Sequence, residues 1–433
     1  MRKYFETTGQ PVTRAEIKRL SRGIIGVKRT TGQHPGGIVV VPGEREIYDF
    51  TPVQYPADKS NHGTITTHFD FNAMHDTILK LDVLGHDDPT MLKMLSDLTG
   101  VSIASIKIPD ERVMSLFLST EALGIPESQT PDDCATLGLP EMGTWMARDM
   151  IKKTRPTRFY DLVQLMGLSH GTGVWKGNAQ ELIESGTCTI NEVIGCRDSI
   201  MTGLIYHGLS SEEAFSIMEQ VRKGKGLTKD QEDLMRRHRL TDWYIESCKK
   251  IKYLFPKAHA VAYTLSALRI AWFKVYYPQA YYCAYFTVRA DEFDSSFMCQ
   301  PKDSIQKTRE QMRRQLKKSG DREQRIYYIL EVIEEMQLRG IHFAPIDLDQ
   351  SDATRFLPLG KDRILPPLNT IPSISATTAG QIVKAREERP FMSRDDLVQR
   401  AGISRSVLDN LSASGCLDHL PDSSQIDLFE LMN

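Results

Sequence analysis

The alternation of apolar and polar positions predicts strands near the start of the chain. Residues 36–42 form a short apolar run between glycine and proline turn signals. Residues 65–70 alternate with period two, and a third run covers 78–84. In this last run we expect Leu79, Leu81 and Val83 to share the buried face, because successive side chains of a strand point to opposite sides.

Helical patterns dominate the rest of the chain. Thr13, followed three residues later by Glu16, is typical of a helix start with a capping box. Between about residues 102 and 290 the apolar spacing is helical, with glycine and proline breaks, and 302–340 reads as two charged helices. Short helices follow between 376 and 417. The predicted fold class is α+β and mostly helical.

Composition narrows the class of protein. The chain has 433 residues, of which 40% are apolar and 25% are charged, ordinary values that exclude wholesale disorder. No apolar run reaches the roughly 18 to 20 residues of a membrane span, and the first twenty residues contain no apolar signal segment. The 7 cysteines form no CxxC pair. We therefore expect a reduced, cytoplasmic protein with neither a structural zinc site nor a disulfide framework.

Positive charge is segregated along the chain. The net charge is −2, yet cations outnumber acids in residues 1–40, 222–257 and 302–325. Such segregation suits a protein that holds a polyanion and stays soluble. The alternative is that these runs are solvated helix faces.

Asp82 is the most conspicuous acidic residue of the predicted strands. A carboxylate within an apolar strand is costly unless it meets a cation or water, and a divalent metal is one natural partner. The alternative is that Asp82 pairs with Lys80 or caps a loop.

Three other segments carry candidate chemistry. Residues 28–37 combine cations, hydroxyls, a histidine and glycines, which suits close approach to phosphate, although a plain glycine-rich turn explains them equally. Residues 168–175 join Ser169 to His170, but adjacent residues do not easily form a nucleophile and base, and no G-x-S-x-G elbow is present, so a hydrolase is excluded. Residues 249–260 interleave cations with aromatic rings, a pattern typical of nucleic-acid binding.

The C-terminal region predicts contacts with DNA and with a protein. Residues 371–386 and 404–417 have the rhythm of paired helix–hairpin–helix units, which present backbone amides to DNA phosphates. In the polar tail, Leu428 and Phe429 are apolar residues that read as a short docking motif, or alternatively as a frayed helix.

In their order along the chain these motifs resemble one family. The segments TTGQHPGGIVVVP, THFDF, KLDVLGHDDPT, EVIGCRDSIM, RKGKGL, KKIKYLFPKAHA and FTVRADEFD are similar to the C-terminal part of the bacterial replicative DNA polymerase III alpha subunit, PolC type. The resemblance covers nearly the whole chain. It implies template-directed DNA synthesis by two-metal nucleotidyl transfer, with Mg²⁺, dNTPs and primer–template DNA.

The resemblance also implies an architecture. We expect the end of a thumb and part of a polymerase-beta-like palm in residues 1–100, and helical fingers in 101–300. Charged connecting helices would cover 301–345 and a duplex-binding helix–hairpin–helix domain 346–420. A tail that docks on the sliding clamp would cover 421–433.

Site residues follow from the matched motifs. Asp82 matches a metal-binding, catalytic carboxylate, and Lys80 is its active-site neighbour. Residues expected near nucleotide or DNA are Lys28, Arg29, His34, Ser169, His170, Thr172, Arg197, Tyr253, Lys257 and His259. Those expected to dock on the clamp are Gln425, Leu428 and Phe429.

Departures from the family pattern limit what we expect of this chain alone. The two other catalytic aspartates of the family lie in an Asp-x-Asp element, which does not occur before residue 13. One aspartate cannot bridge two metal ions, so we expect an inactive chain that needs an upstream polymerase polypeptide. Ser373 and Ser375 replace hairpin glycines, and we expect them to hinder a turn with positive φ. The alternative function is a non-catalytic DNA- and clamp-binding module.

Overall fold

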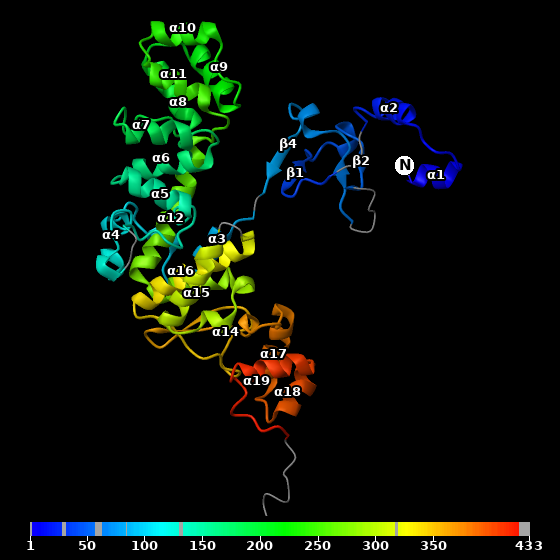
Figure 1. Ribbon diagram of the computed structural model, residues 1–433, viewed down its shortest axis with the longest axis vertical. Helices are drawn as coiled ribbons and strands as arrows, with labels where there is room; N and C mark the ends of the chain where they lie inside the picture. Colours follow the sequence, from blue (N-terminus) through cyan, green and yellow to red (C-terminus); the bar gives the residue numbers. More distant parts are fainter. Residues whose placement is uncertain are drawn as a thin grey trace, which may run out of the picture. The chain divides into compact units, whose positions relative to one another are not determined.

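The computed structural model describes residues 2–27, 32–56, 63–83, 85–129, 133–316 and 319–423 (Figure 1). They divide into two compact units, Met1–His86 and Asp87–Asn433. Short strands are concentrated in the first unit and helices dominate the second. The predicted class, mostly helical α+β, is confirmed.

The first unit contains short strands paired two by two. Its helices and strands are α1 (Arg2–Thr8), α2 (Arg14–Gly23), β1 (Gly37–Val40), β2 (Val53–Gln54), β3 (Thr66–Thr67) and β4 (Leu79–Asp82). Strand β1 pairs antiparallel with β4, and β2 with β3. Thr13 caps α2 as predicted, since its hydroxyl accepts a hydrogen bond from the N–H of Glu16. The Glu16 carboxylate accepts hydrogen bonds from Arg19 and not from the Thr13 N–H, so only one half of the predicted capping box is formed.

The two faces of the β1–β4 sheet differ from the prediction. Leu79, Leu81 and Val83, expected inside, are exposed. The register sets Ile38 opposite Leu81 and Val40 opposite Leu79, so all five side chains form one aliphatic face. The predicted burial was wrong because the described residues of this unit supply no second layer for that face. The apolar side chains buried in this unit include Met74 and Ile78 instead.

The second unit is built from helices. They are α3 (Asp87–Thr99), α4 (Glu111–Ser115), α5 (Trp145–Thr154), α6 (Phe159–His170), α7 (Gln180–Glu184), α8 (Arg197–Tyr206), α9 (Ser211–Arg222), α10 (Lys229–Arg237), α11 (Asp242–Lys250), α12 (Lys257–Tyr276), α13 (Pro278–Thr287), α14 (Ser295–Met298), α15 (Lys302–Gln315), α16 (Asp321–Leu338), α17 (Ala376–Glu388), α18 (Arg394–Ala401) and α19 (Arg405–Ala413). Local signals set several starts: Ser210 and Thr228 cap α9 and α10, and Pro278 opens α13.

The long helix α12 organises this unit. It packs on α3, α6 and α13, and its residues Leu268, Ile270 and Phe273 are almost fully buried. A three-stranded sheet, β5 (His342–Phe343), β7 (Arg363–Leu365) and β6 (Leu357–Leu359), follows the helices, in that spatial order. Strand β6 contacts α13. Helices α17 to α19 have an apolar core of their own, which includes Ile382, Leu397 and Leu411.

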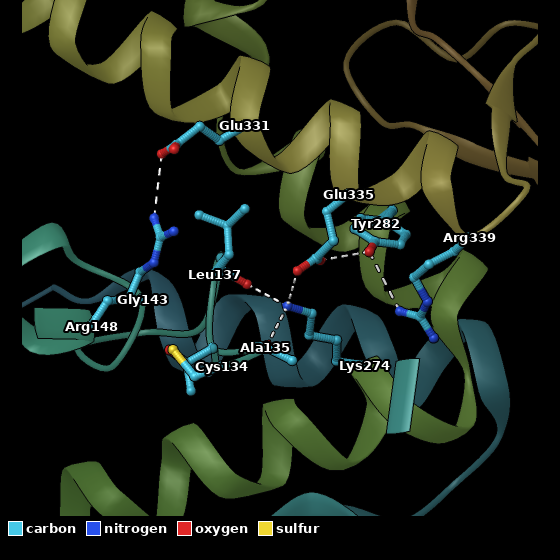
Figure 2. A network of polar contacts seen from close by, with 12 residues as sticks. Cys134, Ala135, Leu137, Gly143, Arg148, Lys274, Tyr282, Glu331, Glu335 and Arg339 are labelled. Atoms are coloured by element: carbon cyan, nitrogen blue, oxygen red, sulfur yellow. Dashed lines mark hydrogen bonds and ion pairs between the residues drawn. The ribbon is translucent and has the colours of Figure 1, made fainter. Parts of the chain in front are cut away.

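Helix α16 carries acidic residues that pair with cations of three other helices. Glu331 accepts a hydrogen bond from Arg148 of α5 at 3.4 Å, and Glu334 pairs with Arg309 of α15 at 2.8 Å. Glu335 pairs with Lys274 of α12 at 2.9 Å and also accepts a hydrogen bond from the Tyr282 hydroxyl. Figure 2 shows the pairs of Glu331 and Glu335 on one side of α16. Charge complementarity thus joins α5, α12 and α15 to α16.

Lys274 and Tyr328 fix the segment 134–143, called the anchored loop below. Lys274 is fully buried, and its ammonium donates to the carbonyl oxygens of Ala135 and Leu137 (Figure 2). Tyr328 accepts a hydrogen bond from the N–H of Gly138 and donates one to the carbonyl of Gly143. A Cβ at Gly143 would lie 2.4 Å from the Tyr328 hydroxyl, so only glycine fits there. The loop is therefore held at both ends, by the fully buried Lys274 and the half-buried Tyr328.

None of the described helices is both long and apolar enough to cross a membrane. The seven cysteines are free thiols, and six of them are buried. Burial raises the pKa of Cys188 to about 11, and it also raises the pKa of Cys248 and Cys283. These thiols therefore stay protonated near neutral pH.

Candidate functional site

Asp82 lies at the end of β4, on the face opposite the aliphatic one. One of its oxygens is 3.2 Å from the Lys80 ammonium, which also sits 4.7 Å above the ring of Phe71. The ion pair that the alternative interpretation predicts is thus present. The Asp82 side chain is nevertheless 51% exposed, so an incoming ligand can reach it.

His34 joins this pair through a close approach that requires Gly37. The Gly36 N–H donates to Nδ1 of His34, so the ring proton sits on Nε2, which lies 3.9 Å from Asp82. In the register Gly37 faces Asp82, and a Cβ there would lie 2.8 Å from Nδ1 of His34. Glycine at this position therefore lets the imidazole reach the carboxylate, a role that the sequence alone did not indicate.

The residues around Asp82 do not make a complete metal site. Within the described ranges there is no group of three or more histidine, cysteine or acidic side chains that could hold a metal ion. Asp82 offers one hard oxygen donor, and Mg²⁺ prefers several oxygen ligands. A two-metal centre therefore needs carboxylates beyond those that are described here.

In the second unit two predicted motifs meet side by side. The N–H of Thr172 donates to the carbonyl of Tyr253 at 3.0 Å, and the N–H of Lys252 donates back to Thr172 at 2.8 Å. This pairing depends on Gly173, which has φ +70 and whose added Cβ would lie 2.5 Å from the Lys250 carbonyl. The chain after α6 is thereby joined to the chain before α12.

A hydrogen-bonded chain of three side chains forms at this junction. Nδ1 of His170, at the end of α6, lies 3.1 Å from Nε2 of His259 in the first turn of α12. Nε2 of His170 lies 3.0 Å from the carboxylate of Glu141, in the anchored loop. The sequence prediction included both histidines and missed Glu141, because 29 residues separate it from His170 and no local pattern relates them.

Aromatic rings enclose the two histidines. Phe255 stacks on His259 with ring centroids 4.7 Å apart, and Tyr263 lies 4.6 Å from His259 and 5.7 Å from His170. Burial, and next the neighbouring His170, lower the pKa of His259 below its ordinary value, while Glu141 acts in the opposite direction. His259 is therefore neutral at pH 7.

Cations gather at the N-terminus of α12. The N–H of Lys257 donates to the Asp198 carboxylate at 2.7 Å, and the N–H of Arg197 donates to the carbonyl of Phe255 at 3.1 Å. The Lys257 ammonium lies 4.7 Å above the ring of Tyr160. Arg197, Lys257 and His259 are thus held on neighbouring segments. The sequence motif around Arg197 includes Asp198, whose capping role was not predicted.

The other predicted site residues that the structure describes are not part of the hydrogen-bonded chain of Glu141, His170 and His259. The Ser169 hydroxyl donates to the Met166 carbonyl within α6 at 3.0 Å. Tyr253 is partly exposed beside Phe255, with ring centroids 5.0 Å apart. Lys28, Arg29, Gln425, Leu428 and Phe429 lie outside the described residues.

The C-terminal hairpin forms despite its serines. Ser373 adopts φ 65, the left-handed conformation that we expected serine to hinder. Ile374 is buried in the core of α17 to α19, and Ser375 caps α17 by accepting a hydrogen bond from the N–H of Thr378. The turn forms because burial of Ile374 and the cap at Ser375 hold it against the strain that Ser373 brings.

Replacing Ser373 with glycine should stabilise the C-terminal helices by about 0.5 to 1 kcal/mol, since glycine adopts positive φ without steric cost. Replacing Ser375 with alanine should destabilise them by about 1 kcal/mol, because α17 loses its cap. Hydrogen exchange of the α17 amides measures both effects. Faster exchange in the Ser373→Gly protein would contradict the assignment of strain to that residue.

Comparisons with protein families match three separate regions of the chain. Residues 3–85 match the model for the bacterial DNA polymerase III alpha NTPase domain, and 88–240 match the finger domain of the bacterial DNA polymerase III alpha subunit. Residues 340–425 match a helix-hairpin-helix motif. The predicted resemblance is thereby confirmed.

Curated relatives give the same result. The chain is 50% identical over 429 residues to the DNA polymerase III PolC-type of Listeria welshimeri and to that of Listeria monocytogenes. Each alignment covers 99% of this chain and 30% of the relative. The Staphylococcus aureus (strain MW2) protein of the same name is 50% identical over 417 residues, which are 96% of this chain and 29% of the relative. The chain thus spans about 30% of the length of these relatives.

Proposed function

Since the chain belongs to the bacterial DNA polymerase III alpha subunit family, PolC type, we propose that it is the part of a replicative polymerase that receives the incoming dNTP and the primer–template. The observation that carries this proposal is the identity of 50% over 99% of the chain.

The N-terminus of α12 is the proposed binding site for the triphosphate. Helix N-termini favour anions, because their first N–H groups lack intrahelical acceptors and the helix dipole is positive there. Arg197 and Lys257 add two cations, and Tyr253 and Phe255 add aromatic surface beside them. His170, Thr172 and His259 line the same junction, and Ser169 supports it through its bond within α6. This combination suits a nucleotide with several negative charges.

The test is nucleotide binding by the Lys257→Met protein. Loss of a charge-assisted contact to phosphate costs about 1.5 to 3 kcal/mol, so affinity for dGTP with Mg²⁺ should fall by roughly tenfold or more. Calorimetric titration measures it. Lys153→Met is the matched control, since Lys153 forms exposed ion pairs with Asp149 and Glu184. Equal affinities for dGTP in the wild-type and Lys257→Met proteins would exclude this site.

Asp82 is the proposed catalytic carboxylate, with Lys80 as its neighbour. It would supply one ligand to a Mg²⁺ site completed by carboxylates of an upstream polymerase polypeptide, because the described residues around it offer too few donors by themselves. We therefore expect no primer extension by the purified chain and synthesis only when that polypeptide is added. Extension by the chain alone would refute the need for a partner.

DNA contacts are proposed for two regions. Lys28, Arg29 and His34 would line the path of the primer near Asp82, and the hairpin at Ser373 would hold duplex phosphates through its backbone amides. The free thiols and the relatives' name, DNA polymerase III PolC-type, support the proposed cytoplasmic location.

The tail is the proposed docking site for the sliding clamp, through Gln425, Leu428 and Phe429. Deleting residues 425–429 should abolish co-elution of the chain with the clamp in size-exclusion chromatography, because an apolar pair in a polar tail is the natural anchor. A scrambled tail of the same composition is the control. Co-elution of the deleted protein would place the contact elsewhere.

The incomplete set of metal ligands in the part of the chain that the structure describes favours a second candidate function, a non-catalytic DNA- and clamp-binding module. The two candidates differ in one outcome. Only a polymerase part regains synthesis when the upstream polypeptide is added, whereas a binding module retains DNA affinity without synthesis.

A further inference from the structure

Glu141 adopts a backbone conformation that few side chains tolerate. Its φ is 59, in the left-handed region where glycine is usual. A residue is held there only when its surroundings determine it, and such positions cluster at functional sites. Its carboxylate lies 3.0 Å from Nε2 of His170. The side chain of this strained residue thus contacts the histidine pair.

The surroundings that determine this conformation are on both sides of Glu141. The anchored loop is fastened before it by Lys274, through the carbonyls of Ala135 and Leu137, and around it by Tyr328, through Gly138 and Gly143. These contacts come from helices α12 and α16, and His259 also lies on α12. One rigid helix therefore fixes both the loop that carries Glu141 and the imidazole at the far end of the hydrogen-bonded chain.

The direction of the hydrogen bonds follows from the chemistry of the groups. An ionised carboxylate only accepts, so Nε2 of His170 carries a proton and donates a hydrogen bond to Glu141. A His170 ring that carries this single proton accepts through Nδ1, and Nε2 of His259 then donates to it at 3.1 Å. Each ring is thereby left in a single tautomer, and the unprotonated Nδ1 of His259 remains as an acceptor for a hydroxyl or N–H group of the nucleotide.

We propose that Glu141 is a positioning residue, which sets the tautomer of His170 and, through it, the orientation and tautomer of His259 at the nucleotide site. This inference rests on the proposed function of the N-terminus of α12. Lys257 and the aromatic rings contribute charge and surface, whereas Glu141 determines which nitrogen of His259 meets the ligand. His170 acts as the connector, and its partial burial shields both hydrogen bonds from water.

The test uses nuclear magnetic resonance of imidazole nitrogens in protein labelled with ¹⁵N-histidine. The wild-type spectrum should show both His170 and His259 protonated on Nε2 alone. Glu141→Gln lets the amide donate to His170 instead of accepting, and Glu141→Gly removes the group while suiting the positive φ. Both variants should lose the single tautomer at His170. The glycine variant keeps the result interpretable if glutamine disturbs the loop.

Glu184→Gln is the matched control, since it removes the same charge from a carboxylate that pairs with Lys153. It should leave both imidazoles unchanged. Unchanged His170 and His259 spectra in Glu141→Gln and Glu141→Gly would overturn the proposal, as would a wild-type His170 protonated on Nδ1.

Binding of dGTP with Mg²⁺ separates this inference from the function on which it rests. If the wild type binds the nucleotide, both Glu141 variants should bind it roughly tenfold more weakly, and wild-type affinity in both would overturn the proposal. If the wild type and all variants fail to bind, the proposed nucleotide site fails. The imidazole spectra then still decide whether Glu141 sets the tautomers.

Discussion

Replacing Lys274 with methionine should lower the free energy of unfolding by about 3 to 5 kcal/mol, the usual cost of removing one partner of a buried ion pair. Lys274 is fully buried and its ammonium serves Glu335 and two loop carbonyls at once. Methionine fills a similar volume, so little of the effect comes from packing. Glu335 would keep the hydrogen bond from Tyr282 and lose its counter-charge. Urea unfolding measures the change.

A double variant separates the ion pair from the loop contacts. Replacing both Lys274 and Glu335 with methionine removes the uncompensated charge, and a buried pair replaced by apolar residues is often close to neutral in stability. The double variant should therefore be more stable than Lys274→Met alone. It should still lack the hydrogen bonds to Ala135 and Leu137. A single variant as stable as the wild type would show that the buried pair contributes nothing.

Replacing Lys274 should change how the free energy of unfolding depends on pH. Burial lowers the pKa of Lys274 to about 8, against the opposing effect of Glu335. The unfolded chain then binds this proton more tightly than the folded one between about pH 8 and the ordinary value of 10.5. In that window the contribution of Lys274 to the free energy of unfolding rises with pH. Below pH 8 the folded protein bears the full cost of burying the charged ammonium. The Lys274→Met protein should lack this rise.

Replacing Asp82 with asparagine should lower primer extension by the reconstituted polymerase at least roughly a thousandfold, which corresponds to about 4 kcal/mol in the barrier. Asparagine has nearly the same shape but no charge, so it is a poor ligand for a hard cation. Because Asp82 is half exposed, the substitution should change stability by no more than about 0.5 kcal/mol. Primer extension with the upstream polypeptide present measures the rate.

Asp76→Asn is the control for this prediction. Asp76 is an exposed aspartate of the same unit, paired with His75, and its loss should leave extension unchanged. The Asp82→Asn chain should still bind its partner polypeptide, which co-purification would verify. Extension at the wild-type rate by the Asp82→Asn enzyme would remove Asp82 from the catalytic site.

Local signals in the sequence predicted local structure well. The Thr13 cap, the strands that became β1 and β4, and the two charged helices α15 and α16 all follow from patterns within a few residues. The strand expected at 65–70 reduces to Thr66–Thr67, because its partner β2 pairs over two residues only. Family motifs supplied the histidines at the α12 junction. The motifs did not predict how the two histidines are arranged relative to each other.

Features set by distant residues escaped prediction. Glu141 meets His170 only because Lys274 and Tyr328, far along the chain, fasten the loop between them. Lys274 itself has a signal, since it is a cation flanked by apolar residues of a helical run, and such a residue is buried only with a partner. Periodicity assigned the wrong face of β4 to the core, because it cannot tell whether a covering layer exists.

The aliphatic face of the β1–β4 sheet has a practical consequence for handling the protein. Neighbouring molecules can associate with this sheet, because the outer edges of its two strands are unpaired among the described residues. The sheet also exposes a row of branched aliphatic side chains. Concentrated samples should therefore form oligomers through the first unit, detectable by light scattering at rising concentration. Working at low protein concentration should reduce this association. A charged substitution on the aliphatic face, such as Leu81→Lys, should also reduce it.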